Sequence, residues 1–228
     1  MAGYAVEATG LSRVFGGASP VHAVRKVDLF LRSGEFLAVI GPSGSGKTTL
    51  LNLIGGLENP TSGRVVVDGH ELGTFGGDAL ADFRRRTIGF VFQLFYLVPV
   101  LTALENVMLP LLPYRRGLGF DLRQRAEELI RYVGLVGRMH HLPGQLSGGE
   151  QQRVAVARAV VNRPKVVLAD EPAGNLDSET GMHIISLLRR LIEEHGISVL
   201  LATHDSAVAA RADRVVHLHD GQIVEDAH

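Results

Sequence analysis

The sequence predicts an α/β protein with a parallel sheet at its centre, an inserted helical subdomain and a small antiparallel β subdomain. Short apolar runs without charged residues recur along the chain and are typical of strands buried on both faces; they span residues 36–40, 88–92, 166–169 and 197–202. Segments with the spacing of amphipathic helices separate these runs. Because parallel strands end at one edge of a sheet, we expect the polar side chains that follow each run to meet there.

The composition suits a folded domain without nucleic-acid chemistry. The 228 residues include 46% hydrophobic side chains, which is enough for a substantial core, and we expect a single domain over residues 1–228. The 23 basic residues are spread among 24 acidic ones, so the net charge of −1 gives no overall case for a nucleic-acid partner. The chain has no cysteine, which excludes disulfides and thiol chemistry. No apolar run follows a basic start, so we expect no signal peptide.

The N-terminal region predicts the antiparallel subdomain. Tyr4–Ala8 and Val27–Leu31 alternate between apolar and polar side chains, as half-buried strands do. Segment 16–20 between them contains glycine and proline and predicts a loop. These strands are expected to flank the first strand of the parallel sheet.

A glycine-rich loop follows the first buried strand and predicts phosphate binding. Its residues are Gly41, Pro42, Ser43, Gly44, Ser45, Gly46, Lys47, Thr48 and Thr49. Glycines let successive N–H groups point into one concavity, and the following helix adds its positive end. Lys47 adds a full charge for the outer phosphates, and Thr48 adds a hydroxyl for Mg²⁺. A glycine-rich turn without this role is the alternative, but the order of strand, loop and apolar helix favours a P-loop NTPase core of the RecA-like type.

The next segment predicts a hairpin, a short helix and another strand. Residues 61–69 predict the hairpin, because Asp68-Gly69 follows a short apolar strand. Asp78–Arg86 predicts the helix, whose run of three arginines is expected on a solvated face. Ile88–Phe92 predicts a buried strand, and Gln93 stands at its exit.

Residues from about 94 to 162 predict the inserted subdomain, which we expect to be almost wholly helical. Apolar residues in 121–136 recur at helical spacing. The most apolar stretch, Leu94–Tyr114, is as long as a membrane span, but its three prolines, Glu105 and Asn106 make it a poor transmembrane helix. We expect this stretch either to fold inward or to contact a partner.

Leu146–Glu150 predicts the start of a helix within this subdomain. Ser147 and Glu150 have the spacing of a capping box, which is a sufficient structural explanation. Gly148 and Gly149 argue against that explanation alone, because each destabilises a helix by about 1 kcal/mol relative to alanine. Glycines in this place also let an anion approach the free N–H groups of the first helical turn.

The last third of the chain predicts two further buried strands. Val166–Ala169 leads directly into Asp170 and Glu171. Two carboxylates at the exit of a buried strand cost free energy unless a cation or a reaction uses them. The second strand, Ile197–Ala202, delivers His204 to the same edge of the sheet.

Between and after these strands lie a helix and a hairpin. The segment 174–177 predicts a turn, and an apolar stripe predicts a helix that begins at Ser178 and ends at Gly196. Residues 214–225 predict a final hairpin with its turn at Asp220-Gly221.

The residues at the strand exits have defined chemical roles beside a magnesium nucleotide. Asp170 can hold the metal through water. Glu171 can accept a proton from an attacking water. His204 can hydrogen-bond the terminal phosphate or position that water, and Gln93 can contact both metal and water. A lone histidine or glutamine is more often structural, so the functional interpretation depends on their place at strand exits.

In these motifs the chain resembles the nucleotide-binding subunits of ATP-binding cassette transporters along nearly its whole length. Gly41–Thr48 matches the Walker A loop, Val166–Asp170 the Walker B strand, Leu146–Glu150 the signature sequence, Gln93 the Q-loop and His204 the switch histidine. The resemblance implies ATP and Mg²⁺ as ligands and ATP hydrolysis as the activity.

The resemblance also implies a head-to-tail homodimer with two ATP molecules at its interface. Each ATP would lie between Lys47 of one subunit and the other subunit's signature residues, Ser147, Gly148 and Gly149. Asp177, at the D-loop position, would lie at that interface.

Further details resemble the LolD, MacB and FtsE types, which serve lipoprotein release, macrolide export and cell division. They are Gly174–Asp177 where many relatives carry Ser-Ala-Leu-Asp, a lengthened loop at Gly16–Val21, and Gly55–Leu57 after the first helix. Ala173 departs from the threonine usual before this glycine. Phe15 takes the place of the usual adenine-stacking tyrosine and keeps its ring; packing in the core is the alternative that its position leaves open.

Such a subunit is expected at the cytoplasmic face of the cell membrane, bound to an integral-membrane permease resembling the MacB or FtsX type. Phe95, Tyr96 and Leu97 are expected in the groove for the permease's coupling helix, with packing inside the subdomain as the alternative. Two functions stay open: driving lipoprotein, lipid or drug export, or an FtsE-like signal through the permease without transport. A DNA clamp is disfavoured, because the chain lacks the heptads and cysteines of such clamps.

Overall fold

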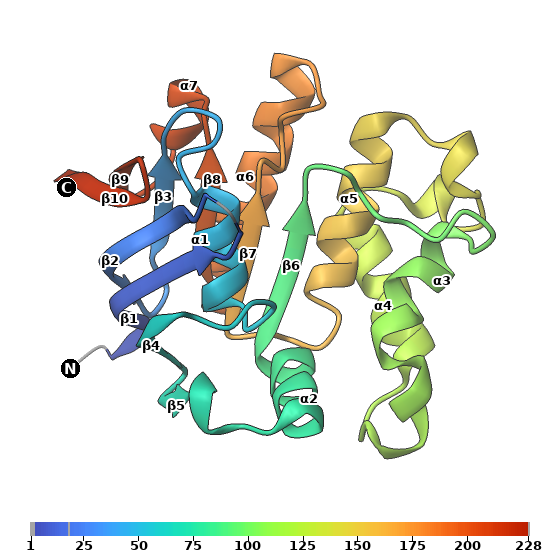
Figure 1. The fold of residues 1–228 in the computed structure, drawn as a ribbon. Coiled ribbons are helices and arrows are strands. Elements are labelled where there is room, and N and C mark those ends of the chain that lie inside the picture. The colour runs from blue at the N-terminus through green and yellow to red at the C-terminus, as the bar shows by residue number, and fades with distance from the viewer. Residues whose placement is uncertain (1–2, 18, 228) are drawn as a thin grey trace.

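The structure, a computed structural model, describes residues 3–17 and 19–227. Its central sheet has the order β10-β9-β3-β8-β7-β6, and the strands from β9 to β6 run parallel (Figure 1). The strand bounds are β3 Phe36–Ile40, β6 Ile88–Phe92, β7 Val166–Asp170, β8 Ser198–Thr203, β9 Arg214–His219 and β10 Gln222–Ala227. The predicted parallel sheet is confirmed, and so is the C-terminal hairpin, in which β10 pairs antiparallel with β9.

The N-terminal part of the chain forms most of a second, antiparallel sheet. Its order is β2-β1-β4-β5. The bounds are β1 Tyr4–Phe15, β2 Val21–Arg32, β4 Ser62–Val67 and β5 His70–Glu71. β1 and β2 are longer than their alternating patterns predict, because irregular pairing steps between Ala8 and Val14 carry the ladder onward to Phe15 and Val21.

Helices complete the fold. The α-helices are α1 Lys47–Ile54, α2 Gly77–Thr87, α3 Ala103–Met108, α4 Leu122–Tyr132, α5 Gly148–Ala159, α6 Ser178–His195 and α7 Ser206–Ala209. Short 3₁₀ segments are η1 Leu72–Thr74, η2 Leu109–Gly117, η3 Val136–Arg138 and η4 Pro143–Gln145. No helix in the described part of the chain combines the length and the apolarity that crossing a membrane requires.

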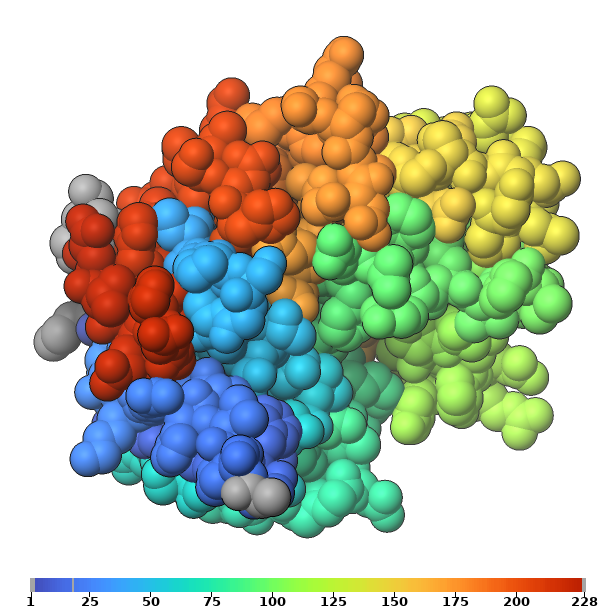
Figure 2. All heavy atoms as spheres, turned by 45° about the horizontal axis from the view of Figure 1, so that its top comes forward, coloured from blue at the N-terminus to red at the C-terminus, as the bar shows by residue number. Residues whose placement is uncertain are grey.

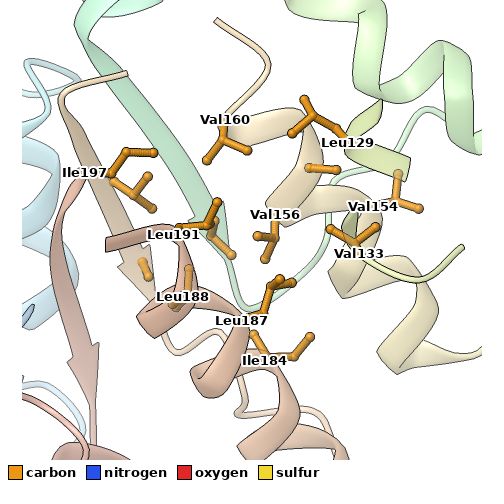
Figure 3. Packing of buried hydrophobic residues seen from close by; sticks show 14 of the residues in the cluster. Leu129, Val133, Val154, Val156, Val160, Ile184, Leu187, Leu188, Leu191 and Ile197 are labelled. Carbon is orange, nitrogen blue, oxygen red and sulfur yellow. The ribbon is translucent and has the colours of Figure 1, made fainter. Parts of the chain in front are cut away.

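The central sheet separates two apolar layers, because successive side chains of a strand point to opposite faces. Phe36 and Ala38 belong to a cluster with helices α3 to α7, whereas Leu37 and Val39 belong to a cluster with α1 and the antiparallel sheet. Figure 3 shows side chains of α4, α5 and α6 gathered in the first cluster. The parallel strands are thus buried on both faces, as their uncharged runs predict.

The inserted subdomain is less helical than predicted at its start. Residues 93–102 contain no helix, and α3 begins only after Thr102, whose side chain caps it. The fully buried Asn106 stabilises this non-helical segment: its amide nitrogen donates to the carbonyls of Val98 and Leu101, at 3.2 and 2.9 Å. A polar residue that argues against a membrane helix therefore satisfies the backbone of an irregular loop.

The arginine run of α2 is only partly solvated, contrary to expectation. Arg86 is exposed, but Arg84 and Arg85 are half-buried. Arg84 donates a 2.7 Å hydrogen bond to the carbonyl of Gly56, and the guanidinium of Arg85 lies 3.9 Å above the ring of Tyr114. The α2 helix is thereby tied to the segment after α1 and to η2 of the inserted subdomain.

Candidate functional site

The exits of β3, β6, β7 and β8 lie at one edge of the central sheet. In the parallel ladders Ile40 pairs with Thr203, Asp170 with Ala202, and Phe92 with Asp170. The residues that follow are the phosphate loop, Gln93, Glu171 and His204. Figure 2 looks toward this edge, where light-blue atoms of the phosphate-loop region lie between the red C-terminal segments and the green and orange segments. The sequence prediction that these four strand exits share an edge is confirmed.

The phosphate loop is shaped by glycines with left-handed backbone angles. Gly44 and Gly46 have φ values of 80° and 103°, which side chains disfavour. A Cβ on Gly46 would also lie 2.2 Å from the carbonyl oxygen of Ala23. The loop therefore packs directly against the backbone of β2 and leads into α1 at Lys47.

The ammonium group of Lys47 lies inside this loop. Its side chain is only 7% exposed, and Nζ donates to the carbonyl oxygens of Gly41 and Pro42 at 2.8 and 3.1 Å. The hydroxyl of Ser45 is buried and has no hydrogen-bond partner among the described residues. A buried charge and an unpartnered hydroxyl in one loop suit an anionic ligand with several oxygens.

A cavity of about 500 Å³ opens beside the loop. It is lined by Pro20, Val21, His22, Ala23, Arg25, Gly44, Gly46, Lys47, Thr48, Thr49 and Asp220. Sequence reasoning found the residues of the phosphate loop. It missed the contributions of β2 and of the β9–β10 turn, since these segments approach the loop only through the fold.

Phe15 is not among the residues that line this cavity. It pairs with Val21, which does line it, and its ring is partly exposed, with the guanidinium of Arg13 4.6 Å from the ring centre. The alternative prediction, that Phe15 packs in the core, is therefore wrong. Its stacking on an adenine stays a prediction.

Glu171 is held at the centre of the strand exits. Its side chain is 14% exposed, and Oε1 lies 2.9 Å from Nδ1 of His204 and 3.9 Å from Nζ of Lys47. The hydroxyl of Thr203 donates to Oε2 at 3.3 Å. The backbone of Glu171 has a φ of 47°, which side chains disfavour and which turns the chain sharply at the end of β7. These contacts place the carboxylate of Glu171 between the imidazole of His204 and the ammonium group of Lys47.

Asp170 is the last residue of β7 and is half-buried. Burial raises the pKa of its carboxyl, the negative charge of Glu171 acts in the same direction, and the hydroxyl of Thr48 and the charge of Lys47 oppose it. Oδ1 of Asp170 is buried without a hydrogen-bond partner among the described residues. An unpartnered carboxylate oxygen near a threonine hydroxyl is a donor set for a hard cation such as Mg²⁺, which combines few protein oxygens with phosphate oxygens and water. These residues therefore fit the predicted metal.

Gln93 lies against the loop that follows Glu171. Its Nε2 donates to Oδ1 of Asn175 at 3.1 Å, and Nδ2 of Asn175 donates to the main-chain oxygen of Gln93 at 3.2 Å. Gln152 of α5, which sequence reasoning missed, donates to the carbonyls of Phe92 and Pro172 at 3.2 and 2.7 Å. Hydrogen bonds from three side chains thus join the exits of β6 and β7.

The Leu146–Glu150 segment forms the predicted capping box. Ser147 caps α5 and Glu150 accepts from the backbone N–H of Ser147 at 2.8 Å. Gly149 is buried, and a Cβ at this position would lie 2.3 Å from Cγ2 of Thr180. One of the two glycines therefore has a structural reason within the chain, namely the close packing of α5 on α6.

Ser147, Gly148 and Gly149 do not line the cavity beside the phosphate loop. In Figure 2 the yellow segment that leads into α5 lies at the right edge of the molecule, and green and orange segments separate it from the light-blue loop near the centre. Asp177 caps α6 by accepting from the N–H of Thr180 at 2.9 Å, and this hydrogen bond lowers its pKa. The structure thus brings together one group of predicted residues and leaves the signature segment apart from it.

Comparisons with known proteins identify relatives over most of the chain. Residues 24–174 match the family model described as ABC transporter. The lipoprotein-releasing system ATP-binding protein LolD of Syntrophotalea carbinolica is 50% identical over 96% of this chain and 96% of that protein. The macrolide export ATP-binding/permease protein MacB of Rhodopirellula baltica is 48% identical over 92% of this chain, which spans only 31% of that protein.

A solved structure resembles the whole fold. It is a dimeric, post-hydrolysis state of the ATP-binding cassette MJ0796 bound to ADP and Pi. It superposes with a TM-score of 0.89 and 44% identity, covering 97% of each chain. The protein of the same name from Methanocaldococcus jannaschii is an uncharacterised ABC transporter ATP-binding protein.

Proposed function

Since the chain belongs to the ABC transporter family and is an ATPase of that family, we propose that it powers a separate membrane permease of the MacB or LolD type. It acts as a head-to-tail dimer at the cytoplasmic face of the membrane. The work done is export or release of a lipoprotein, lipid or drug. The single observation that carries this proposal is the meeting of Lys47, Asp170, Glu171 and His204 at one sheet edge beside the phosphate-loop cavity.

The cavity beside the phosphate loop holds ATP in this proposal. Backbone N–H groups of residues 43–49 surround the phosphates, and Lys47 exchanges the carbonyls of its own loop for phosphate oxygens. Lys47→Ala should therefore weaken ATP binding at least about tenfold, because a full charge is removed from the anion site. Lys165→Ala, on the loop before β7, is the control, and unchanged ATP affinity of the Lys47 variant by calorimetry would contradict the assignment.

Thr48, Gln93 and Asp170 hold Mg²⁺ in this site. When bound, Mg²⁺ neutralises charge that develops on the phosphates. Asp170 would help to hold the metal through Oδ1, which has no hydrogen-bond partner among the described residues. Thr48 presents its hydroxyl from the first turn of α1.

Glu171 acts as the general base and takes the proton of the attacking water. Its hydrogen bonds to His204 and Thr203 fix the direction of the carboxylate. His204 in turn hydrogen-bonds the terminal phosphate, and Gln93 orients the water. The low exposure of Glu171 supports this role, because a general base works best where bulk water does not compete.

A second copy of the chain completes the site. Ser147, Gly148 and Gly149 stand away from the cavity of their own subunit, which supports their use by the partner in a head-to-tail arrangement. Asp177 then lies at the interface. A dimer seen for the MJ0796 cassette, with ADP and Pi bound to it, supports the same assembly for this chain.

The permease docks in a groove that lies between helix α2 and strand β6 on one side and the inserted helical subdomain on the other. A cavity of about 710 Å³ is lined by residues of α2, β6, η2 and α5 together with Tyr96. Tyr96 and Val100 are exposed, at 63% and 80%, in the non-helical segment after β6. Exposed apolar residues beside an apolar groove favour a docking partner. This segment also contains Phe95 and Leu97, which are half-buried, so they pack the subdomain as well.

Reconstitution tests the function. The subunit is purified with the permease encoded by the neighbouring gene, placed in liposomes, and assayed for movement of lipoprotein, lipid or macrolide in the presence of ATP. Transport that Glu171→Gln abolishes would support the proposal. ATP hydrolysis stimulated by the permease without movement of any of these substrates would support instead the FtsE-like signalling function. Tyr96→Ala should remove the stimulation by the permease and keep the basal hydrolysis.

A further inference from the structure

Asn175 forms a pair of hydrogen bonds with Gln93 that joins two separate loops of the site. One bond runs from Gln93 Nε2 to Asn175 Oδ1 at 3.1 Å, and the other returns from Asn175 Nδ2 to the main-chain oxygen of Gln93 at 3.2 Å. The two residues are 82 positions apart in the chain, so the pair is a product of the fold.

The pair fixes which end of the Gln93 amide is free. A primary amide has a donor nitrogen and an acceptor oxygen, and only the oxygen can bind a cation. The nitrogen is engaged by Asn175, whereas the side-chain oxygen makes no hydrogen bond to the described residues. Rotation of the amide by half a turn would bring two acceptor oxygens face to face and is disfavoured for that reason.

The backbone around Asn175 is built for this contact. Gly174 allows it, because a Cβ at this position would lie 3.0 Å from Nε2 of Gln93 and 3.3 Å from the carbonyl oxygen of Glu171. The N–H of Gly174 donates to that carbonyl at 3.0 Å, so a tight turn connects Glu171 to Asn175. A side chain at 174 would therefore force its neighbours, Gln93 among them, to shift by a few tenths of an ångström.

We infer that Asn175 is a positioning residue that orients the side-chain oxygen of Gln93 toward the metal of the nucleotide. This inference rests on the proposed role of Gln93 as a ligand. Partners that orient a metal ligand contribute to metal affinity although they do not touch the metal. Asn175 therefore acts on the metal only through Gln93.

The test measures metal binding separately from hydrolysis. The affinity for Mn²⁺, a paramagnetic probe for the Mg²⁺ site, is measured by electron paramagnetic resonance with saturating AMP-PNP. The full-length protein is compared with Gln93→Ala, Asn175→Ala and the double variant. Asn175→Asp keeps an acceptor for Nε2 of Gln93. Asn59→Ala is the matched control, because Asn59 is an exposed asparagine whose side chain makes no hydrogen bond to the described residues.

Each single alanine variant should weaken Mn²⁺ binding about tenfold. The double variant should bind Mn²⁺ no more weakly than Gln93→Ala alone, because Asn175 has nothing to orient once the glutamine is removed. Asn175→Asp should recover most of the affinity. AMP-PNP binding measured in EDTA should be the same in all proteins.

Any one of four results would overturn the inference. Asn175→Ala could leave Mn²⁺ affinity unchanged while Gln93→Ala weakens it, in which case the role of Gln93 survives alone. The two effects could multiply in the double variant, or AMP-PNP binding in EDTA could fall for Asn175→Ala, and either would assign Asn175 a general structural role. Unchanged Mn²⁺ affinity of Gln93→Ala would remove the proposed metal role of Gln93 together with the inference.

Discussion

Nδ1 of His204 lies 2.9 Å from Oε1 of Glu171, and the two residues come from the exits of neighbouring parallel strands. The carboxylate accepts this hydrogen bond, so the histidine limits the directions in which the glutamate can point. His204→Ala should lower the ATPase rate roughly ten- to hundredfold, which corresponds to losing about 1.5–3 kcal/mol from a hydrogen bond to a charged group. Steady-state hydrolysis at saturating ATP measures this effect. His183→Ala, an exposed histidine on α6, should leave the rate unchanged.

Glu171→Gln should lower the rate further, by about 10²–10⁴-fold, because the amide cannot accept a proton. ATP binding should persist, since the amide has nearly the same shape as the carboxylate. The measurement is hydrolysis with the permease present, together with ATP binding by the same protein. Glu179→Gln, in the exposed first turn of α6, is the matched control. A Glu171→Gln protein that hydrolyses ATP at nearly the unmodified rate would refute the role of general base.

Asp170→Asn should stabilise the protein in the absence of nucleotide. Burial raises the pKa of Asp170 above its ordinary value of 3.8. At pH values between 3.8 and this raised pKa, the carboxyl holds a proton in the folded protein that it has released in the unfolded chain. The free energy of unfolding of the unmodified protein therefore falls as pH rises through this window, and asparagine removes the effect.

The stability difference between Asp170→Asn and the unmodified protein should accordingly grow as the pH rises above 3.8 and become constant once the pH exceeds the raised pKa. Urea unfolding at several pH values, without nucleotide or metal, measures it. A difference that stays constant with pH would show that ionisation of this carboxyl does not oppose folding. Stabilisation by added Mg²⁺ and ATP should be weaker in the variant, since a metal partner is lost.

Gly149→Ala should destabilise the fold by about 1–3 kcal/mol, because the new methyl group would overlap Cγ2 of Thr180. Thr180→Ala removes that methyl group, so the double variant should lose less stability than the sum of the two single changes. Chemical denaturation of the four proteins gives the coupling energy. Strict additivity would mean that the helices move apart without cost, and Gly149 would then have no structural role.

Much of the fold follows from local sequence signals. Uncharged runs identified the buried strands, and the helix ends at Ser147, Ser178 and Gly196 were recognisable because capping side chains and a left-handed glycine have local causes. The convergence of Gln93 and Glu171 was predictable from one rule, that parallel strands end at the same edge.

Other features depend on distant pairings that no local pattern encodes. Val21 and Arg25 line the cavity because β2 packs beside the phosphate loop, which the order of strands in the sheets decides. Gln152 was overlooked because a glutamine in a helix predicts a solvated face, whereas here it is fully buried between the exits of β6 and β7. The non-helical start of the inserted subdomain depends likewise on the buried Asn106.

The left-handed backbone of Glu171 places stability and chemistry in conflict at one residue. Glycine would relax this conformation, as any residue with a side chain resists it. A library of variants screened only for heat tolerance would therefore be expected to accumulate glycine at position 171 and to lose turnover in the same step. Evolution toward a hotter habitat must find its gains elsewhere in the chain, and position 171 should stay fixed while the surface diversifies.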